Sequence, residues 1–561
     1  MALTPGDGVV VVVVDALAPV DAVGELGAVA CDHAVSDDVA KATASASLRV
    51  GFIGSPFRAR AAKWPALACD CRAPAAFEPG LEPVGAGGGR PAAGLSAPES
   101  ARNPIAREPL RPKLLQYAVR RIPVVVALVL ASAGIGGCAP AMAPIDPAAR
   151  SAYDPGLVAQ GAALAALGNC RACHTARNGQ AFAGGEPMHS RFGTIYSTNI
   201  TPDPETGIGR WSEEAFRRAM RKGLRNDGDH LYPAFPYDHF TRVTDEDIHA
   251  LYAYFMSLPP VSSTPPHNAL AFPFNLRIGN ALWKRLYLHE GPRPPDPAKD
   301  ATLARGEYLV EGLAHCGACH TPRNFLQAEK RDRAYDGGDL EGWHGYAINA
   351  KNAAPIPWER EALASYLRNG YHPWHGASRG TMGIVTRELA NAPEADVNAM
   401  AAYAASLMGP ADPARRSRGR ALARTPLARN AGAASSASAV LYETACLQCH
   451  DGSRELPFGG VPLAYSLGLN GESPRNLINV IVHGLDPAPG DTSPMMPGYA
   501  GALNDGEIEA LVQWLRENLT DKPRWDGVAA LIRESRAMNA DMLLFPPGGT
   551  GADPAAQPAR N

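Results

Sequence analysis

The feature that most constrains this chain of 561 residues is a five-residue pattern, C-x-x-C-H, which occurs three times. The copies occupy residues 170–174, 316–320 and 446–450. They use six of the ten cysteines, and the other four precede the first copy: Cys31, Cys69, Cys71 and Cys138. Any fold must therefore hold two thiols and one imidazole together at three places.

C-x-x-C-H is the attachment signature of c-type haem. Each thiol can add to one vinyl group of the porphyrin, and the adjacent histidine then lies under the iron as its proximal ligand. The predicted attachment residues are Cys170, Cys173, Cys316, Cys319, Cys446 and Cys449, and the predicted iron ligands are His174, His320 and His450. We therefore expect three covalently bound haem c groups.

Two other chemistries use closely spaced cysteines. A thiol–disulfide redox pair does not need a following histidine, but all three pairs have one. A zinc site needs four ligands, and no copy has a second cysteine pair nearby. Both alternatives are weaker than haem attachment.

The sequence around the motifs also repeats. Behind each copy lies a long loop region and then a helix with apolar residues at i, i+3, i+4 and i+7. These stripes are Ile248, Leu251, Tyr252 and Phe255, then Val397, Met400, Ala401 and Ala404, then Ile508, Leu511, Val512 and Leu515. We predict an all-α fold with three units, 152–262, 301–410 and 438–520, each a small bundle around one porphyrin that fills its thin core.

Residues 263–300, rich in proline, are predicted to be a semi-rigid linker with a short helical piece. Residues 411–437, rich in Arg, Ala and Ser, are predicted to be a second linker, either a solvated tether or a segment attracted to anionic lipid. Residues 521–561 are expected to form a short helix at 527–538 and a disordered tail.

Residues 112–143 have the layout of a secretory signal, with a basic start and an apolar run at 122–133. Cleavage after Ala141 or Ala143, lipidation of Cys138 and retention as an anchor are open alternatives. Because export signals begin a chain, residues 1–111 are predicted to be absent from the mature protein. We expect the protein at the periplasmic face of the inner membrane.

Methionine is a common sixth ligand of cytochrome iron, and it raises the reduction potential. Met382 lies 15 residues before Val397, and Met496 lies 12 residues before Ile508. These matching positions predict both as axial ligands. Met495 competes with Met496, which we favour because Pro497 stiffens the loop after it.

The corresponding position in the first unit is Phe235, 13 residues before Ile248. A phenyl ring cannot bind iron, so the first haem is either five-coordinate or takes another ligand. His239 on the same loop and Met188 are candidates, and either a five-coordinate or a histidine-ligated iron should have a lower potential than its neighbours.

Several stretches resemble the three-haem cytochrome c subunit of membrane-associated bacterial dehydrogenases. They read FGTIYSTNITPDPETGIGRWSEEAFRRAMRKG, LYPAFPYDHF, TDEDIHALYAYF, VEGLAHCGACHTPRN, HGASRGTMGIV and MPGY. The resemblance covers roughly residues 152–520 and implies three tandem class I cytochrome c-like domains. LYPAFPYDHF is more similar to the branch that serves molybdenum hydroxylases such as nicotinate, isoquinoline or aldehyde dehydrogenases. The quinoprotein alcohol dehydrogenase branch instead has methionine at the position of Phe235.

The resemblance implies an electron-transfer subunit at the membrane surface. It would accept electrons from a dehydrogenase catalytic subunit and pass them to quinone or a terminal oxidase. No G-x-G-x-x-G opens a helix and no nucleophile–base pair stands out, so we expect no substrate site or catalytic residue in this chain. A net charge of −3 gives no support for nucleic-acid binding. The alternative is that an open first haem acts on peroxide or senses a gas.

Overall fold

The computed structural model describes residues 139–149, 152–294, 296–424, 436–450, 461–485 and 495–538. All of them belong to one compact unit, Arg107–Asn561. The predicted extension (1–111), the basic and apolar parts of the predicted signal and the tail beyond residue 538 lie outside the described residues. Among the helices that the structure describes, none has the length and apolar character needed to span a bilayer.

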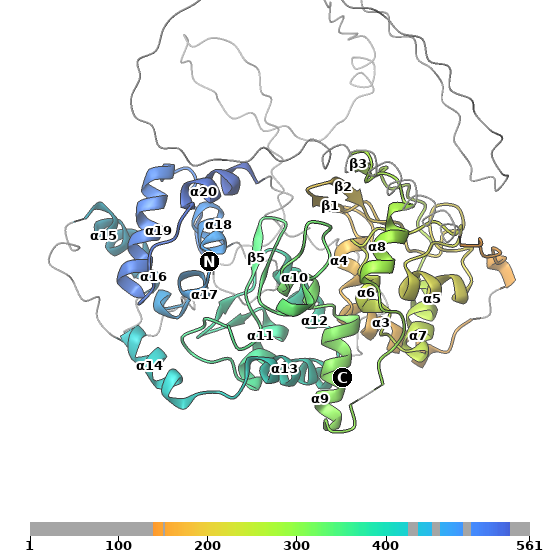
Figure 1. Ribbon diagram of the computed structural model, residues 1–561, viewed down its shortest axis with the longest axis horizontal. Coiled ribbons are helices and arrows are strands. Elements are labelled where there is room, and N and C mark those ends of the chain that lie inside the picture. Colours follow the sequence, from red (N-terminus) through yellow and green to blue (C-terminus); the bar gives the residue numbers. More distant parts are fainter. Residues whose placement is uncertain are drawn as a thin grey trace, which may run out of the picture. The chain divides into compact units, whose positions relative to one another are not determined.

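Each motif lies in a series of short elements that ends in a long helix (Figure 1). The first series is η1 (Pro147–Ala149), α3 (Pro155–Leu167), α4 (Cys170–His174), β1 (Pro187–Ser190), β2 (Gly193–Tyr196), α5 (Glu213–Lys222), α6 (Tyr237–Phe240) and α7 (Asp245–Ser257). The connection to the second series contains β3 (Ala269–Leu270) and α8 (Gly279–Tyr287).

The second series is α9 (Ala301–Tyr308), the π-helical turn η2 (Leu309–Leu313), α10 (Gly317–His320), η3 (Arg331–Arg333), β4 (Gly338–Leu340), β5 (Trp343–Gly345), α11 (Arg360–Asn369), β6 (Tyr371–His372), β7 (Gly376–Ala377), α12 (Thr381–Leu389) and α13 (Glu394–Met408). Helix α14 (Pro413–Arg424) follows within the predicted second linker. The third series is α15 (Ala437–Leu441), η4 (Tyr442–Cys446), α16 (Leu447–His450), η5 (Leu463–Tyr465), α17 (Leu467–Asn470), α18 (Arg475–His483) and α19 (Asp505–Leu519), and α20 (Val528–Ala537) lies where the C-terminal helix was expected.

The closing helices α7 and α19 begin at side-chain caps. Thr244 accepts the Asp247 backbone N–H at 3.2 Å, and Asn504 forms a reciprocal capping box with Glu507. Such caps satisfy donors that the first helical turn leaves free. The predicted apolar stripes face inward: Ile248, Val397 and Ile508 are completely buried. The prediction of a closing helix with a buried apolar stripe behind each motif is therefore confirmed.

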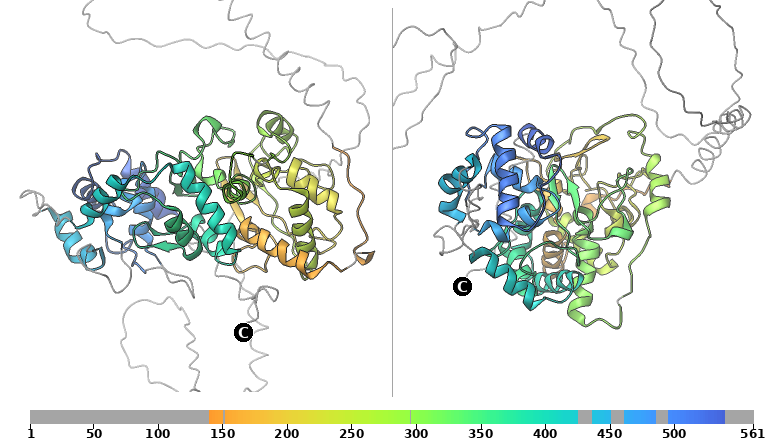
Figure 2. Two further views of the ribbon diagram at one scale, coloured as in Figure 1. Left: turned by 90° about the horizontal axis from the view of Figure 1, so that it is seen from below. Right: turned by 60° about the vertical axis from the view of Figure 1, so that its left-hand side comes forward.

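Two glycines allow the first and last helices of a series to touch. A Cβ atom on Gly161 of α3 would lie 2.0 Å from the Ala250 carbonyl oxygen of α7. A Cβ atom on Gly306 of α9 would lie 2.1 Å from the Ala399 carbonyl oxygen of α13. The contact between α3 and α7 can be followed in Figures 1 and 2. Only a residue without a side chain permits so close an approach of two backbones.

The described residues are rich in helix, but the all-α prediction is wrong because they also contain short antiparallel strands. β1 pairs with β2 and β2 with β3, while β4–β5 and β6–β7 form two-stranded hairpins. These strands lie outside the helices, in the loop regions and in the connection to the second series. Backbone groups in long packed loops need hydrogen-bond partners, and the hairpins supply them.

The hydrophobic core also differs from three separate bundles. One cluster of buried residues joins the first two series, with Leu251 and Phe255 of α7 alongside Leu309 and Leu313 of η2. The third series has its own cluster, centred on α18 and α19. The first two motifs therefore share a packed interior.

Candidate haem sites

Each motif folds as a short helix, and this brings its three functional groups to one face. Cys170 and His174 are the first and last residues of α4. Cys316 and Cys446 lie directly before α10 and α16, which end at His320 and His450. Residues three and four positions apart share a helix face. Both thiols and the imidazole of each motif can therefore point toward one planar group.

A backbone carbonyl orients each motif histidine. The Nδ1 atoms of His174, His320 and His450 lie 2.7, 2.7 and 2.8 Å from the carbonyl oxygens of Thr198, Tyr346 and Val461, respectively. A carbonyl can only accept, so Nδ1 carries the proton and the lone pair is on Nε2. This second contact is typical of histidines that bind a metal.

Burial sets the charge state of these groups. It lowers the pKa of His174, His320 and His450, which favours the neutral ring that a metal requires. It also raises the pKa of the Cys170 and Cys316 thiols to about 12. Reactive thiol–disulfide pairs have lowered thiol pKa values. The environment therefore disfavours the redox-pair alternative.

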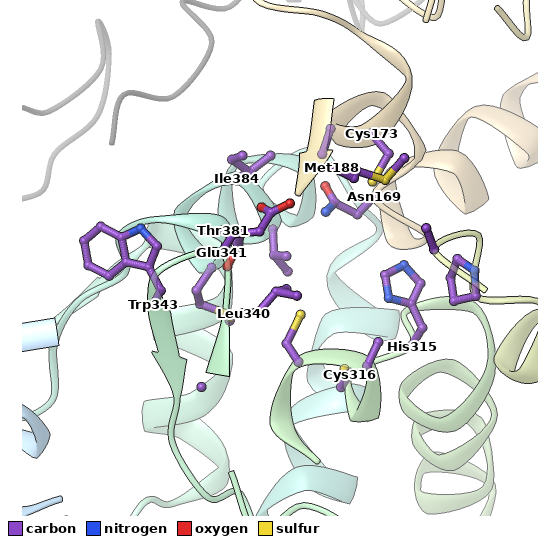
Figure 3. Close-up of a pocket in the computed structure, with 18 of the residues that line it drawn as sticks. Asn169, Cys173, Met188, His315, Cys316, Leu340, Glu341, Trp343, Thr381 and Ile384 are labelled. Carbon is purple, nitrogen blue, oxygen red and sulfur yellow. The ribbon is translucent and has the colours of Figure 1, made fainter. Parts of the chain in front are cut away.

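The three motifs line one continuous cavity of about 1820 Å³. A pocket for a single small ligand has a volume of roughly 300–1,000 Å³, so this space suits more than one large group. Figure 3 shows Asn169 and Cys173 of the first motif region near His315 and Cys316 of the second. The lining includes aliphatic and aromatic side chains from all three series.

The lining also fits the polar edge of a porphyrin. Asn280 Nδ2 and His375 Nε2 are buried atoms of cavity-lining residues, and neither has a hydrogen-bond partner in the described structure. The His375 ring stacks on Trp358 at a centroid distance of 3.6 Å, which fixes its orientation. Buried polar groups are normally paired. A group with an apolar disc and carboxylates would fill the cavity and accept from Asn280 Nδ2, and from His375 Nε2 in the tautomer that carries the proton there.

The structure brings the predicted methionines to the same cavity. Met382 is the second residue of α12, and it lines the cavity. Met496 lines the cavity and packs against the third core, where its backbone forms a bridge with Leu485. Its competitor Met495 is 71% exposed. Met495 also lines the cavity, so the choice of Met496 and the axial role of Met382 stay predictions.

Phe235 and Met188 line the cavity in the first series, but His239 does not. The Phe235 ring packs on Phe240 of α6, with centroids 5.2 Å apart. Phe240 also lines the cavity, so α6 turns this residue inward and His239 to the other side. Position in the sequence could not reveal which face of this one-turn helix meets the cavity.

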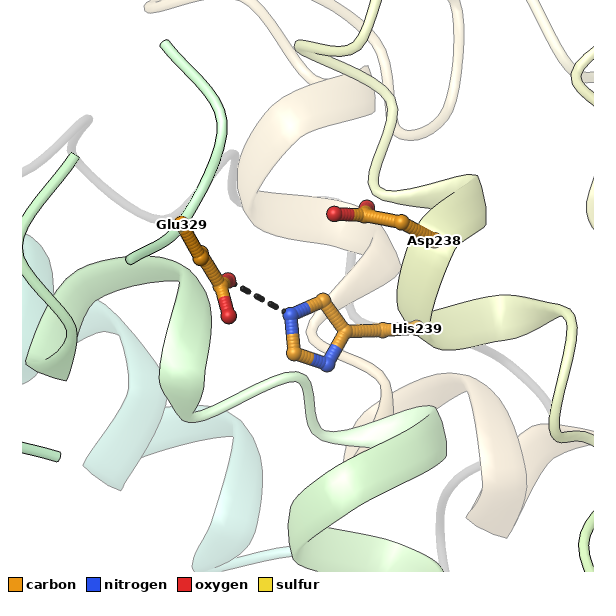
Figure 4. A group of neighbouring side chains, drawn as sticks. All are labelled: Asp238, His239 and Glu329. Carbon is orange, nitrogen blue, oxygen red and sulfur yellow. Dashed lines mark hydrogen bonds and ion pairs between the residues drawn. The ribbon is translucent and has the colours of Figure 1, made fainter. Parts of the chain in front are cut away.

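Both ring nitrogens of His239 are engaged elsewhere (Figure 4). Nδ1 donates to the Glu311 carbonyl oxygen at 2.9 Å, and Nε2 lies 2.7 Å from Glu329 Oε1. Burial opposes a charge on the ring, but the hydrogen bond and charge of Glu329 outweigh it and raise the pKa of His239. A histidine held in this way cannot donate a lone pair to iron. The structure therefore does not support the proposed role of His239 as sixth ligand.

Sequence reasoning missed two cavity residues. His315 directly precedes the second motif, and its Nε2 lies 3.3 Å from the Gly168 carbonyl oxygen, two residues before Cys170. It adopts a left-handed backbone conformation with φ 41°. His375 is the second histidine of the stretch YHPWHG. The signal in the sequence was their position: His315 is adjacent to the predicted attachment residue Cys316, and His375 lies seven residues before the predicted ligand Met382.

Comparison with known proteins agrees with this geometry. Residues 158–259 match the family described as cytochrome c, and residues 433–515 match cytochrome C oxidase, cbb3-type, subunit III. The chain is 36% identical over 411 residues to the cytochrome c subunit of the quinone-dependent alcohol dehydrogenase of Gluconacetobacter polyoxogenes, covering 69% of this chain and 86% of that protein. The chain belongs to the dehydrogenase cytochrome c subunits.

Other members of this family are also similar. The gluconate 2-dehydrogenase cytochrome c subunit of Pantoea cypripedii is 37% identical over 385 residues, or 64% of this chain and 85% of that one. A nicotinate dehydrogenase subunit of Pseudomonas putida is 43% identical over 409 residues, 71% of this chain, but the match spans 33% of that longer protein. Cytochrome c domains carry covalent haem, so this dehydrogenase cytochrome c subunit is an electron-transfer protein.

Proposed function

We propose that the chain carries three haem c groups, each in one of three tandem class I cytochrome c-like domains, and conducts electrons between a partner dehydrogenase and an acceptor. The observation that carries the proposal is that three C-x-x-C-H helices line one cavity, each with its histidine oriented by a backbone carbonyl. The attachment residues are the six motif cysteines, and the proximal ligands are His174, His320 and His450. Met382 and Met496 are the proposed axial ligands of the second and third sites.

Bound haem supplies a one-electron couple, and the surrounding residues set its potential. The carbonyls of Thr198, Tyr346 and Val461 hold the histidines as neutral Nε2 donors. Thioether ligands at Met382 and Met496 favour higher potentials than the first site, where Phe235 offers no lone pair. Electrons would therefore enter at the first site and leave through the other two.

Contacts between the series support transfer along the chain. His315 joins the first and second motif regions through Gly168. Between the second and third series, His344 of β5 lies 2.7 Å from Glu472 Oε1. Asn476 of α18 adds two hydrogen bonds to the His344 backbone, each 2.8 Å long. These contacts fix the separations on which electron transfer depends.

The electron donor is proposed to be a molybdenum hydroxylase, with a quinoprotein alcohol dehydrogenase as the alternative. The match to the nicotinate dehydrogenase subunit, at 43% identity, favours the first. The acceptor is proposed to be quinone or a terminal oxidase, at the periplasmic face of the inner membrane. Purification of the native complex followed by metal analysis tests the partner: molybdenum supports the first assignment, and a quinone cofactor without molybdenum supports the second.

The haem count is tested by intact mass and absorption of the exported protein. Cys316→Ala/Cys319→Ala should reduce three covalent haems to two, while Ala318→Ser, between these cysteines, should retain three. An unaltered haem count in the double variant, or no Soret band in the unmodified protein, would contradict the assignment.

Phe235 supports a second candidate function, in which the first haem has an open position for peroxide or a diatomic gas. Phe235 lines the cavity, and His239 is committed to Glu311 and Glu329. Carbon monoxide should then bind the reduced protein at one haem of three. If all three haems are inert to carbon monoxide, this function is excluded, and Met188 becomes the candidate ligand.

A further inference from the structure

Exposed apolar side chains are concentrated in one region of the described structure. Nine large apolar residues are exposed in the described part, and seven of them come from residues 272–286 and 325–326. They are Phe272, Leu276, Ile278, Leu282, Leu286, Phe325 and Leu326, which we name the α8 patch. Large contiguous apolar patches on a folded protein usually mark interaction sites.

The two segments of the patch are held together by specific contacts. Trp283 Nε1 donates to the Leu326 carbonyl oxygen at 2.9 Å. The Phe192 ring stacks on Phe274 at 3.9 Å and meets the edge of Phe325 at 6.0 Å. These contacts place the exposed side chains on one supported surface rather than on separate loops.

Helix α8 presents its aliphatic residues as a stripe. Ile278, at its N-cap, Leu282 and Leu286 recur every four residues and are 44%, 44% and 56% exposed, respectively. Trp283 packs edge-on against Tyr237 at 5.8 Å and anchors the opposite face of the helix. The helix is thus fixed to the protein on one side, and its aliphatic stripe borders the haem cavity while staying partly open to solvent. Helices that lie in a membrane interface also expose an apolar stripe.

Filling of the haem cavity does not explain the whole patch. Five of the seven patch residues, Leu276, Ile278, Leu282, Leu286 and Leu326, line the cavity, so a bound haem covers part of their surface. Phe272 and Phe325 do not line it and are 79% and 66% exposed. These two rings need another partner.

The charges around the patch favour an anionic partner. No Asp or Glu occurs between Asp247 and Glu290, and this stretch contains Arg277, Lys284 and Arg285. Arg285 is exposed, whereas Lys284 donates to the Lys222 and Gly223 carbonyl oxygens and Arg277 to that of His230.

The turn between β1 and β2 adds a further positive charge beside the patch. Arg191 lies over the Phe325 ring, 5.2 Å from its centroid. Three acids lie near the basic residues of α8 and its approach: Asp229, 3.9 Å from Arg277, Asp227 near the same guanidinium, and Glu290 near Lys284. None of these ion pairs involves Arg285 or Arg191. Aliphatic and phenylalanine side chains beside unopposed arginines match an anionic lipid surface, where basic residues interact with lipid phosphates.

We propose that the α8 patch docks this protein on anionic bilayers. Phe272, Phe325 and the α8 leucines enter the interface between lipid headgroups and acyl chains, and Arg285 and Arg191 contact phosphates. This inference rests on the proposed function, which locates the protein at a membrane surface. Docking by this face turns one rim of the haem cavity toward the lipid.

The test compares binding of the full-length haem-loaded protein to phosphatidylglycerol-containing and pure phosphatidylcholine vesicles. Phe272→Ser/Phe325→Ser should weaken vesicle binding about tenfold, because two apolar side chains lose their burial in lipid. Arg285→Glu should weaken binding to the anionic vesicles more than to the neutral ones. Val440→Ser removes an exposed apolar residue from α15 and should leave binding unchanged. Any N-terminal anchor is identical in all variants.

Hydrogen exchange locates the contact. Peptides from residues 269–288 should gain protection when anionic vesicles are added, and those from 437–446 should not. Unchanged exchange at 269–288, or unchanged binding of Phe272→Ser/Phe325→Ser, would overturn the proposal. So would loss of binding to the dehydrogenase subunit or loss of self-association in that variant, with vesicle binding intact. Haem content and reduction by a soluble donor should stay normal, and their failure would count against the proposed function instead.

Discussion

Replacing His344 by glutamine should remove a pH-dependent link between the second and third series. His344 lies between two carboxylates, with Nδ1 2.7 Å from Asp339 Oδ1 and Nε2 2.7 Å from Glu472 Oε1. Burial disfavours charge on the ring, but the hydrogen bonds to Asp339 and Glu472 outweigh it and raise the pKa of His344 to about 9. The histidine is therefore protonated at neutral pH.

The size of the effect follows from this pKa. A rise from 6.5 to about 9 corresponds to at most about 3.4 kcal/mol of folding free energy. The carboxylates of Asp339 and Glu472 are 66% and 48% exposed, so solvent screening reduces the expected contribution to about 1–2 kcal/mol. Because the folded-state pKa is raised, this stability is fully present below pH 6.5 and is lost as the pH rises through 9.

Guanidinium unfolding of the haem-loaded protein, followed by far-ultraviolet circular dichroism at pH 6 and pH 9.5, measures the contribution. The unmodified protein should lose about 1–2 kcal/mol more than His344→Gln between these pH values. His267→Gln, at an exposed position, is the control and should behave like the unmodified protein. The reasoning fails if His344→Gln is as stable as the unmodified protein at pH 6, or if both show the same pH dependence.

Three further substitutions test the packing, the caps and the first haem. Gly161→Ala places a Cβ atom 2.0 Å from the Ala250 carbonyl oxygen, so it should lower the free energy of unfolding by about 1–3 kcal/mol and reduce the melting temperature. The control Gly279→Ala meets no atom within 4 Å and should leave the melting temperature unchanged. Asn504→Ala removes the capping box of α19 and should cost about 1 kcal/mol in chemical denaturation; an unchanged midpoint would show that the cap is not needed. Phe235→Met should raise the potential of one haem in a redox titration and abolish carbon monoxide binding, and an unaltered titration would show that residue 235 does not face the iron.

Much of the site was predictable because its signals are local. The spacing of two cysteines and one histidine fixes their common face on a helix, wherever that helix lies. The closing helices were equally predictable, since the stripes beginning at Ile248, Val397 and Ile508 record which face is buried. Met382 and Met496 line the cavity 15 and 12 residues before Val397 and Ile508, and so few residues before a packed helix limit how far a side chain can lie from it.

The tertiary structure decided what depends on distant partners. Thr198, Tyr346 and Val461 orient the motif histidines through backbone carbonyls, which no side-chain pattern encodes. His239 and Phe235 occupy one short loop, and only packing against Glu311 and Glu329 shows that the histidine turns away while the ring stays inside. The amino-acid sequence by itself determined the cofactor chemistry and the repeated helices, because both arise from contacts within a few turns. The shared core of the first two series and the exposed α8 patch arise from contacts between distant segments, so only the folded chain reveals them.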